Sequence, residues 1–175
     1  MLKRRFAWVI AIPVALMSAT PFAVASVPAS AATSAPTEPA IFNAHQVKSV
    51  QSGKCLTNGG STANSAPITQ FTCNGNANQA WTYNSSTLVF ANNSGMCLTD
   101  GGSTANSAPI TQFACNGSQN QEWLLFIESD GSSEGIENAH TGKCMTNGGS
   151  KANSAPITQF TCASNDSDRN QWFTG

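Results

Sequence analysis

The strongest constraint on the fold is a block of 13 residues that occurs three times along the chain. It spans residues 59–71, recurs unchanged at residues 101–113, and recurs at residues 148–160 with Lys151 as its single change. Repeats with a period of about 20–50 residues are typical of architectures in which several copies share one core, because one copy cannot bury its own apolar face. The sequence therefore predicts three similar units of about 42 residues within one domain.

The N-terminal 25 residues have the order of a secretory signal. Three cations near the start precede an apolar run, and small residues follow as far as Ala25. A membrane span is the alternative, but the run is too short to cross about 30 Å of hydrocarbon and contains Pro13. We therefore expect residues 1–25 to be removed and the protein to be secreted. Residues 26–40 are rich in Ala, Ser, Pro and Thr and are predicted to be a disordered leader, which leaves residues 41–175 as the folded domain.

Each block has one cysteine before it and one after it, always 18 positions apart. In an exported chain, an even number of regularly spaced cysteines indicates disulfides rather than catalytic or metal-binding thiols. Six cysteines allow 15 connectivities, and the repeat favours pairing within each unit. The predicted pairs are Cys55–Cys73, Cys97–Cys115 and Cys144–Cys162. Each would close a loop of about 19 residues and contribute about 3 kcal/mol in the loop-entropy account.

Turn signals and short apolar runs predict an all-β fold. Asn-Gly and Asp-Gly pairs recur in every unit, and no apolar pattern of helical period extends over ten residues. The first cysteines of the second and third units lie 47 rather than 42 residues apart, and the excess maps to a polar loop at residues 128–135. The predicted core positions are Val47, Val89 and Ile136; Leu56, Leu98 and Met145; Ile68, Ile110 and Ile157; and Trp81, Trp123 and Trp172. Stacking on a ligand is the alternative role for the tryptophans.

Charge and composition exclude several functions. Removal of the signal leaves five cations against nine acids, a net charge of −4, with no basic cluster that could neutralise a nucleic-acid backbone. Only His45 and His140 could act as acid–base groups near neutral pH, and neither lies in a catalytic motif. We interpret both as surface turn residues. No zinc or calcium-loop spacing is present once the cysteines are paired, so we expect no metal and no cofactor.

The units also share an opening and a closing motif. Residues 53–56, 95–98 and 142–145 read Gly-x-Cys-Leu or Gly-x-Cys-Met, and the first two units close with Asn-Gln-x-Trp. The third unit ends Arg-Asn-Gln-Trp at residues 169–172. With the paired cysteines, this pattern resembles the ricin-type β-trefoil lectins over residues 42–173. The resemblance implies a β-trefoil of twelve strands with pseudo-threefold symmetry, and sugar binding in one shallow pocket per unit.

The resemblance also implies which residues form these pockets. The family's pocket uses an acidic residue two positions after the first cysteine, an aromatic residue two positions before the second, and the Asn of Asn-Gln-x-Trp. Here the acidic position holds Thr57, Thr99 and Thr146. The candidate carbohydrate-binding residues are Asn58, Phe71, Asn78 and Gln79; Asp100, Phe113, Asn120 and Gln121; and Asn147, Phe160 and Asn170.

The second unit is predicted to have the best pocket, because Asp100 alone keeps a carboxylate next to the acidic position. The alternative for Asp100 is a purely structural role in an Asp-Gly turn. In the third unit, ten residues rather than eight separate Cys162 from Trp172, which places Asn170 at the usual Gln position.

Strand alternation makes a further prediction for the repeated block. If the isoleucines face inward, the phenylalanines face outward and the intervening glutamines turn inward, where their amides need partners. The alternative is that these glutamines line the pocket. They are Gln70, Gln112 and Gln159.

The function predicted from the sequence is that of a secreted, non-catalytic carbohydrate-binding protein. Up to three weak, similar sites would act together on a polysaccharide or glycan, and the protein would be a monomer that does not insert into membranes. The alternative is a β-trefoil that has lost sugar binding and acts through its loops on a protein partner, as an inhibitor or a structural module.

Overall fold

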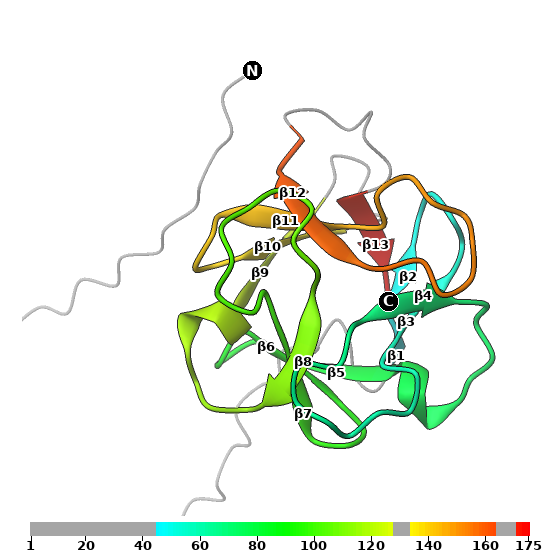
Figure 1. The fold of residues 1–175 in the computed structure, drawn as a ribbon, viewed down its shortest axis with the longest axis horizontal. Helices are drawn as coiled ribbons and strands as arrows, with labels where there is room; N and C mark the ends of the chain where they lie inside the picture. Colours follow the sequence, from blue (N-terminus) through cyan, green and yellow to red (C-terminus); the bar gives the residue numbers. More distant parts are fainter. Residues whose placement is uncertain (1–44, 128–133, 164–170) are drawn as a thin grey trace, which may run out of the picture. The chain divides into compact units, whose positions relative to one another are not determined.

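Short antiparallel strands joined by tight turns form the computed structural model, which describes residues 45–127, 134–163 and 171–175 (Figure 1). These residues belong to one compact unit of the chain. The signal and leader predicted at residues 1–40 lie outside them. Within them no helix has the length and apolar character needed to span a bilayer.

The strands follow the repeat. The first unit holds β1 (His45–Gln46), β2 (Lys48–Ser49), β3 (Cys55–Thr57), β4 (Thr69–Phe71), the single-turn helix η1 (Ala77–Gln79) and β5 (Ala80–Asn84). The second holds β6 (Val89–Asn92), β7 (Met96–Thr99), β8 (Thr111–Ala114), η2 (Gln119–Gln121) and β9 (Trp123–Ile127). The third holds β10 (Glu134–Asn138), β11 (Lys143–Thr146), β12 (Thr158–Thr161) and β13 (Trp172–Thr174). Only Val47 separates β1 from β2, so each unit contributes four strand positions, as the β-trefoil requires.

Three isoleucines join the units at their centre. The N–H of Ile68 donates to the carbonyl of Ile110, that of Ile110 to Ile157, and that of Ile157 to Ile68, each at 2.9 Å. All three side chains are fully buried, and β4, β8 and β12 surround a common centre in Figure 1. These bonds form a closed ring, called here the isoleucine ring, so every unit is both donor and acceptor to its neighbours.

The glutamines of the repeated block lie beside this ring and are fully buried, as strand alternation predicts. The Nε2 of Gln112 donates to the carbonyls of Ser61 and Ala63 in the first unit, at 2.8 and 3.0 Å. Its Oε1 accepts from the amides of Asn58 and Asn92, at 3.1 and 2.8 Å. The corresponding carbonyls are those of Ser150 and Ala152 for Gln70, and of Ser103 and Ala105 for Gln159. This set of contacts, the glutamine clasp, therefore links units rather than lining a pocket.

The predicted core is largely confirmed. Ten of the twelve predicted residues are fully buried: Val47, Leu56, Ile68, Trp81, Leu98, Ile110, Trp123, Ile136, Met145 and Ile157. The indole Nε1 groups of Trp81 and Trp123 donate to the carbonyls of Leu56 and Leu98, both at 3.1 Å. These tryptophans are structural, because nothing of them is exposed to a ligand.

The core prediction was wrong at Val89, which is half-buried while Phe90 occupies the core position. The turn before Cys97 explains the shift. It closes with a hydrogen bond from Gly95 to Asn92, three residues apart, whereas the same turn spans four residues in the other two units. Counting back eight residues from the cysteine therefore overshoots by one in the second unit.

In the third unit a core residue that was not predicted, Phe173, takes the place of the closing tryptophan. Phe173 of β13 pairs with Ser49 of β2. Trp81 of β5 holds the corresponding register position, because it pairs with Asn92 of β6. Phe173 is fully buried in the core. The closing motif of the third unit is therefore Gln-x-Phe, beginning at Gln171.

The polar insertion is shorter than predicted. Glu134 and Gly135 belong to β10, where they pair with β9 and β13. The ring of Phe126 lies over Gly135 at the place that a Cβ atom would fill, so a larger residue at this position would have to displace that ring. Residues 128–133 lie outside the described part of the chain.

All three predicted disulfides are confirmed. Cys55–Cys73, Cys97–Cys115 and Cys144–Cys162 join Cα atoms 5.1, 5.1 and 4.9 Å apart. Each covers the outer face of its hairpin and closes the loop that carries the repeated block, so the clasp loops are covalently restrained.

We expect Gln112→Ala to lower the free energy of unfolding by about 2–4 kcal/mol, because it removes four hydrogen bonds of a fully buried side chain and leaves the buried amide of Asn92 without its partner. Urea denaturation monitored by tryptophan fluorescence measures this change. Phe113→Ala, one residue further along β8, is the matched control and should cost less than about 1 kcal/mol because its ring is exposed. Equal losses in the two variants would contradict the clasp.

Burial also perturbs two acidic groups near β9. Desolvation and, secondarily, the charge of Glu134 raise the pKa of Tyr83 to about 12, and its hydroxyl donates to the carbonyl of Trp123 at 2.9 Å. Desolvation raises the pKa of Glu134 above its ordinary value. A raised carboxyl pKa means that the folded state binds this proton more tightly than the unfolded state, so its contribution to stability is lost as pH rises through the folded-state pKa.

Glu134→Gln should therefore stabilise the protein, relative to the wild type, more at pH 8 than at pH 4, because ionisation of the wild-type carboxyl group is disfavoured in the folded state. Thermal unfolding of the wild type and the variant at the two pH values tests this. The difference in melting temperature between the two proteins at each pH isolates residue 134 from all other titrating groups. An equal gain at both pH values would show that the effect does not come from ionisation.

Candidate functional site

One phenylalanine of each unit is exposed at the same position of the repeated block. Phe71, Phe113 and Phe160 are 39%, 38% and 44% exposed, whereas the glutamine before each is fully buried. Successive strand residues point to opposite faces, so the inward glutamine fixes the outward phenylalanine. The prediction that these rings face outward is confirmed.

The outer face of each hairpin carries polar groups beside the ring. In the first unit Phe71 pairs with Cys55, and Thr69 pairs with Thr57 two residues away, so these side chains share one face of the sheet. Thr69 is half-buried and Thr57 buried. The aromatic patches are defined here as the exposed phenylalanine with the threonine two residues before it: Phe71 and Thr69, Phe113 and Thr111, and Phe160 and Thr158.

The hydroxyl oxygens of Thr57 and Thr99 accept hydrogen bonds from within the protein. The Oγ1 of Thr57 accepts from the backbone N–H of Gly59 and from Nδ2 of Asn78, both at 3.0 Å. Thr99 accepts in the same way from Gly101 and Asn120, at 3.1 and 3.0 Å. One amide hydrogen of each asparagine therefore holds the η1 or η2 turn against the hairpin.

The residues after these threonines are buried turn residues. Asn58, Asp100 and Asn147 are 5%, 1% and 1% exposed. Each side-chain Oδ1 accepts from the N–H two residues on, at 3.0, 2.7 and 3.0 Å. The structure thus gives Asp100 the turn role that was the alternative in the sequence, because neither Asn58, Asp100 nor Asn147 presents its side chain to solvent.

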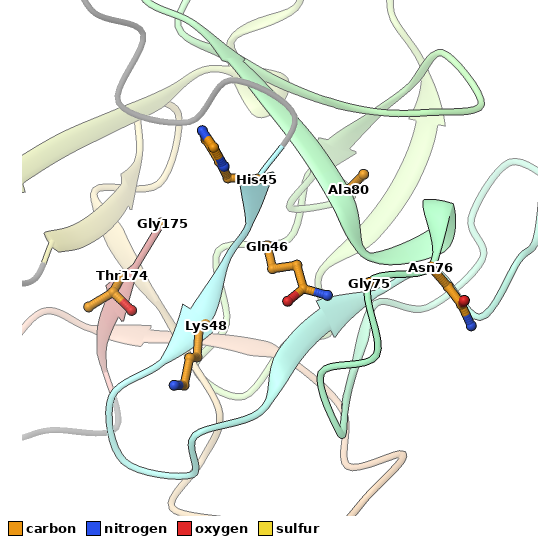
Figure 2. Close-up of a pocket in the computed structure, with 8 residues that line it drawn as sticks. All are labelled: His45, Gln46, Lys48, Gly75, Asn76, Ala80, Thr174 and Gly175. Carbon is orange, nitrogen blue, oxygen red and sulfur yellow. The ribbon is translucent and has the colours of Figure 1, made fainter.

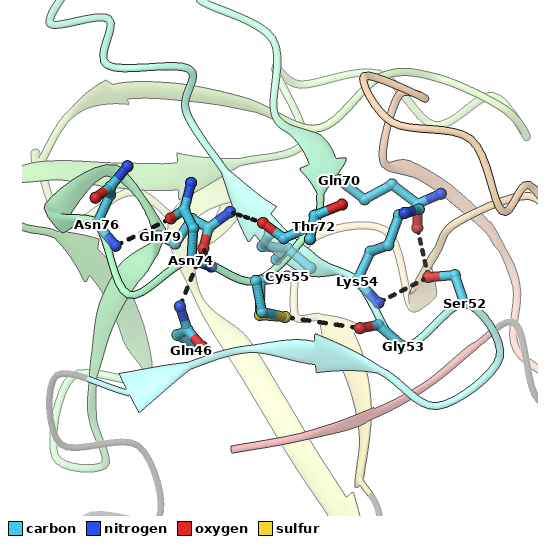
Figure 3. The surroundings of a disulfide bond; sticks show 12 residues. Gln46, Ser52, Gly53, Lys54, Cys55, Gln70, Thr72, Asn74, Asn76 and Gln79 are labelled. Carbon is cyan, nitrogen blue, oxygen red and sulfur yellow. Dashed lines mark hydrogen bonds between the residues drawn. A yellow bond between two sulfur atoms is a disulfide. The ribbon is translucent and has the colours of Figure 1, made fainter.

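The glutamines of the closing motif are also internal. Gln79 and Gln121 are 0% and 1% exposed. The Nε2 of Gln79 donates to the carbonyl of Thr72 at 3.0 Å, and its Oε1 accepts from the N–H of Asn74 at 2.9 Å, beside the first disulfide (Figure 3). Gln121 makes the same pair of bonds with Ala114 and Asn116. Their amides pin the loop after the second cysteine and are not available to a ligand.

In the third unit this role belongs to Gln171. Its Oε1 accepts from the N–H of Ala163 at 2.6 Å and its Nε2 donates to the carbonyl of Thr161 at 2.8 Å. The assignment of Asn170 to the Gln position is therefore corrected. Asn170 itself lies outside the described residues; in the sequence it precedes Gln171 as Asn78 precedes Gln79.

Comparison with known proteins identifies the family. The model of the ricin-type beta-trefoil lectin domain matches residues 43–173. The chain belongs to this family. A comparison with curated protein sequences gave no significant match.

Solved structures share the fold of this lectin domain. The designed threefold-symmetric protein ThreeFoil is 24% identical with a TM-score of 0.68, over 74% of this chain and 94% of its own. A ricin B-like lectin from Macrolepiota procera, solved with lactose, is 17% identical with a TM-score of 0.61, over 74% and 91%. An exo-beta-1,3-galactanase from Clostridium thermocellum is 27% identical with a TM-score of 0.66 over 74% of this chain, but the match spans only 29% of that enzyme.

The histidines of the lectin domain differ from each other. His140 lies in a turn, as predicted, and its Nδ1 is 3.0 Å from Oδ2 of Asp100, joining the third unit to the second. His45 is in strand β1 opposite Trp81, so the turn prediction was wrong for it. A feature of the sequence that marks the contact between His140 and Asp100 is the acid at position 100, where the other two units have asparagine.

One cluster in the described part of the lectin domain brings three metal-ligating atoms together, namely Glu137 with the sulfurs of Cys144 and Cys162. These two sulfurs bond to each other, so they are not thiolates and cannot ligate a metal as thiolates do.

Asp100→Asn should preserve both the fold and any glycan binding, because an asparagine makes the same turn in the first and third units. Asp100→Ala should lower the free energy of unfolding by about 1–3 kcal/mol, because it removes the hydrogen bonds of a buried carboxylate with the N–H of Gly102 and the ring of His140. Differential scanning calorimetry and polysaccharide depletion measure the two effects. A loss of glycan binding in a folded Asp100→Asn protein would make Asp100 a ligand after all.

Proposed function

We propose that this protein binds carbohydrate without catalysis, through the three aromatic patches, as a secreted monomer. The observation that carries the proposal is the exposure of a large apolar ring at the same position in every unit of a lectin-family fold. Core packing does not explain the choice of phenylalanine at these positions, because none of the three rings belongs to the core cluster.

The physical basis is stacking. A flat ring covers the apolar C–H face of a pyranose, while hydroxyl groups at the edge, such as that of Thr69, can exchange hydrogen bonds with the sugar. The family's acidic residue is replaced by a threonine whose Oγ1 already accepts two hydrogen bonds. Each patch therefore lacks the two-oxygen grip of a carboxylate on neighbouring hydroxyls and should bind one sugar weakly.

Three weak sites suit a repetitive target. Linked sites that engage together can raise avidity about 10²–10⁴-fold without any new contact. A polysaccharide offers many identical sugar faces, whereas a free monosaccharide offers one. We therefore assign polysaccharides or densely presented glycans as ligands.

Secretion and lack of catalysis belong to the same proposal. The N-terminal residues have the pattern of a secretory signal, and three disulfides suit an oxidising compartment. The aromatic patches contain only phenylalanine and threonine, which provide no general acid or base. A domain of this kind also matches a minor part of the galactanase, where 71% of the enzyme lies outside the match.

The test measures depletion of the full-length protein from solution by insoluble glucan, xylan, chitin and galactan. We expect retention on at least one of them, and at least about 10-fold weaker retention for the triple variant Phe71→Ala, Phe113→Ala, Phe160→Ala. Leu124→Ala is the matched control, because Leu124 is 40% exposed but lies on β9 outside the patches. Hydrolysis of any of these polysaccharides would contradict the non-catalytic part.

One observation favours a second candidate function. Asn58, Asp100 and Asn147 are all buried, so none of them replaces the missing acid at the surface. If no polysaccharide retains the wild-type protein, the candidate that remains is a protein partner bound through the exposed loops.

A further inference from the structure

A groove separate from the aromatic patches opens where the first and third units meet. It has a volume of about 400 Å³ and is bordered by β1 and β2, by the end of β13, and by residues 75–80 (Figure 2). It is lined by His45, Gln46, Lys48, Gly75, Asn76, Ala80, Thr174 and Gly175. We call it the β1–β2 groove; none of these residues was a candidate carbohydrate-binding residue in the sequence.

The ionisable side chains on its border are both bases. His45 and Lys48 are exposed and lie on consecutive strands, β1 and β2, that are separated along the chain only by Val47. Among the described residues that line the groove none is an aspartate or a glutamate, and its single carboxylate is the backbone one of Gly175, the last residue of the sequence. A protein with more acids than bases therefore concentrates two of its few basic groups at one concave place.

The strand register shows that this basic character is specific to the first unit. Lys48 pairs with Cys55 as Ala91 pairs with Cys97 and Glu137 with Cys144. His45, Leu88 and Glu134 lie three residues before these positions. His45 pairs with Trp81 and Glu134 pairs with Phe173, while the carbonyl of Leu88 accepts a hydrogen bond from the N–H of Trp123. The same two positions therefore hold His and Lys in the first unit, Leu and Ala in the second, and two Glu residues in the third.

Ala80 adds to this contrast. It pairs with Gln46, and its counterpart in the second unit is Glu122, which bridges to Val89. A small neutral residue at this position adds no charge to the lining of the groove, whereas a glutamate would add a carboxylate to it. The repeated block is almost unchanged between units, so the difference lies at positions that the fold does not dictate.

We propose that the β1–β2 groove binds an acidic sugar unit, one that carries a carboxylate or a sulfate. Lys48 supplies the counter-charge as a point charge, and the amide of Asn76 and hydroxyl of Thr174 supply hydrogen-bonding groups at the border. The volume suits one or two sugar rings, since small-molecule sites measure about 300–1,000 Å³. This rests on the proposed function only in that the ligand is a sugar.

The chain supplies its own substitutions for a test. Lys48→Ala and Lys48→Glu introduce the residues that the second and third units carry at this position, so both should fold. Lys151→Thr is the charge-matched control, because it removes an exposed lysine outside the groove and makes the third block identical to the others. Thermal unfolding of each variant verifies that the fold is retained.

The probe is trigalacturonate, compared with its neutral methyl ester, added to the full-length protein while backbone amide NMR shifts are followed. We expect shifts at Gln46, Gly75 and Asn76, and weaker binding of the ester. Lys48→Ala should weaken trigalacturonate binding about 2- to 5-fold, Lys48→Glu more than Lys48→Ala, and Lys151→Thr not at all. Binding should also weaken from 20 to 200 mM NaCl, because the charges are exposed.

Galactose 6-sulfate, inorganic sulfate and inorganic phosphate form the remaining arms. Tighter binding of galactose 6-sulfate than of inorganic sulfate supports a sugar site, whereas equal binding of all anions overturns it in favour of a simple anion site. Shifts that are absent, or unchanged in Lys48→Glu, also overturn it. The triple phenylalanine variant should keep these shifts, which separates failure of the groove from failure of the aromatic patches.

Discussion

The isoleucine ring is the interaction on which the rest of this molecule depends. Three backbone hydrogen bonds of 2.9 Å join Ile68, Ile110 and Ile157 in a cycle, and each bond needs a donor from one unit and an acceptor from another. No unit can satisfy these groups by itself, and an unpaired backbone group in a dry core is costly. The glutamine clasp joins the units in a second cycle, in which the side-chain amide of each glutamine donates to loop carbonyls of a neighbouring unit. The near-identity of the 13-residue blocks follows, because every block contacts another block.

This inner constraint determines the outer face. A glutamine that must point inward forces the next residue, a phenylalanine, to point outward, so the exposed rings of the three units follow from the clasp beneath them. The disulfides then fix the hairpin edges beside each ring. Stability and the proposed sugar contact are therefore encoded in adjacent residues of one strand, with opposite exposures.

Sequence reasoning predicted those features that repeat and missed those in which the units differ. The three disulfides, the inward glutamines and the outward phenylalanines follow from spacing and alternation alone. Phe90 and Phe173 were missed because a turn shorter by one residue and a longer closing loop shift the register, and equal counting from a cysteine does not detect either change. The burial of Asp100, and its contact with His140, depends on a packing partner 40 positions away that no local pattern contains.

The same comparison separates scaffold from candidate site. Gln79 and Gln121 are prominent in the motif because the loop needs their amides, whereas Lys48 and His45 lie at positions with no motif and different charges in each unit. Within one chain, positions that vary while their neighbours repeat are the ones that the fold leaves open to function.

The cyclic order of the isoleucine ring has a consequence for assembly during folding. The residues that form the ring belong to the repeated blocks. Two of the three blocks are identical, and the third differs at Lys151 alone. A unit from a second molecule offers the same donors and acceptors at the same spacing as the chain's own. At high protein concentration, refolding thus competes with exchange of units between chains, which yields domain-swapped dimers with every hydrogen bond of the native ring intact.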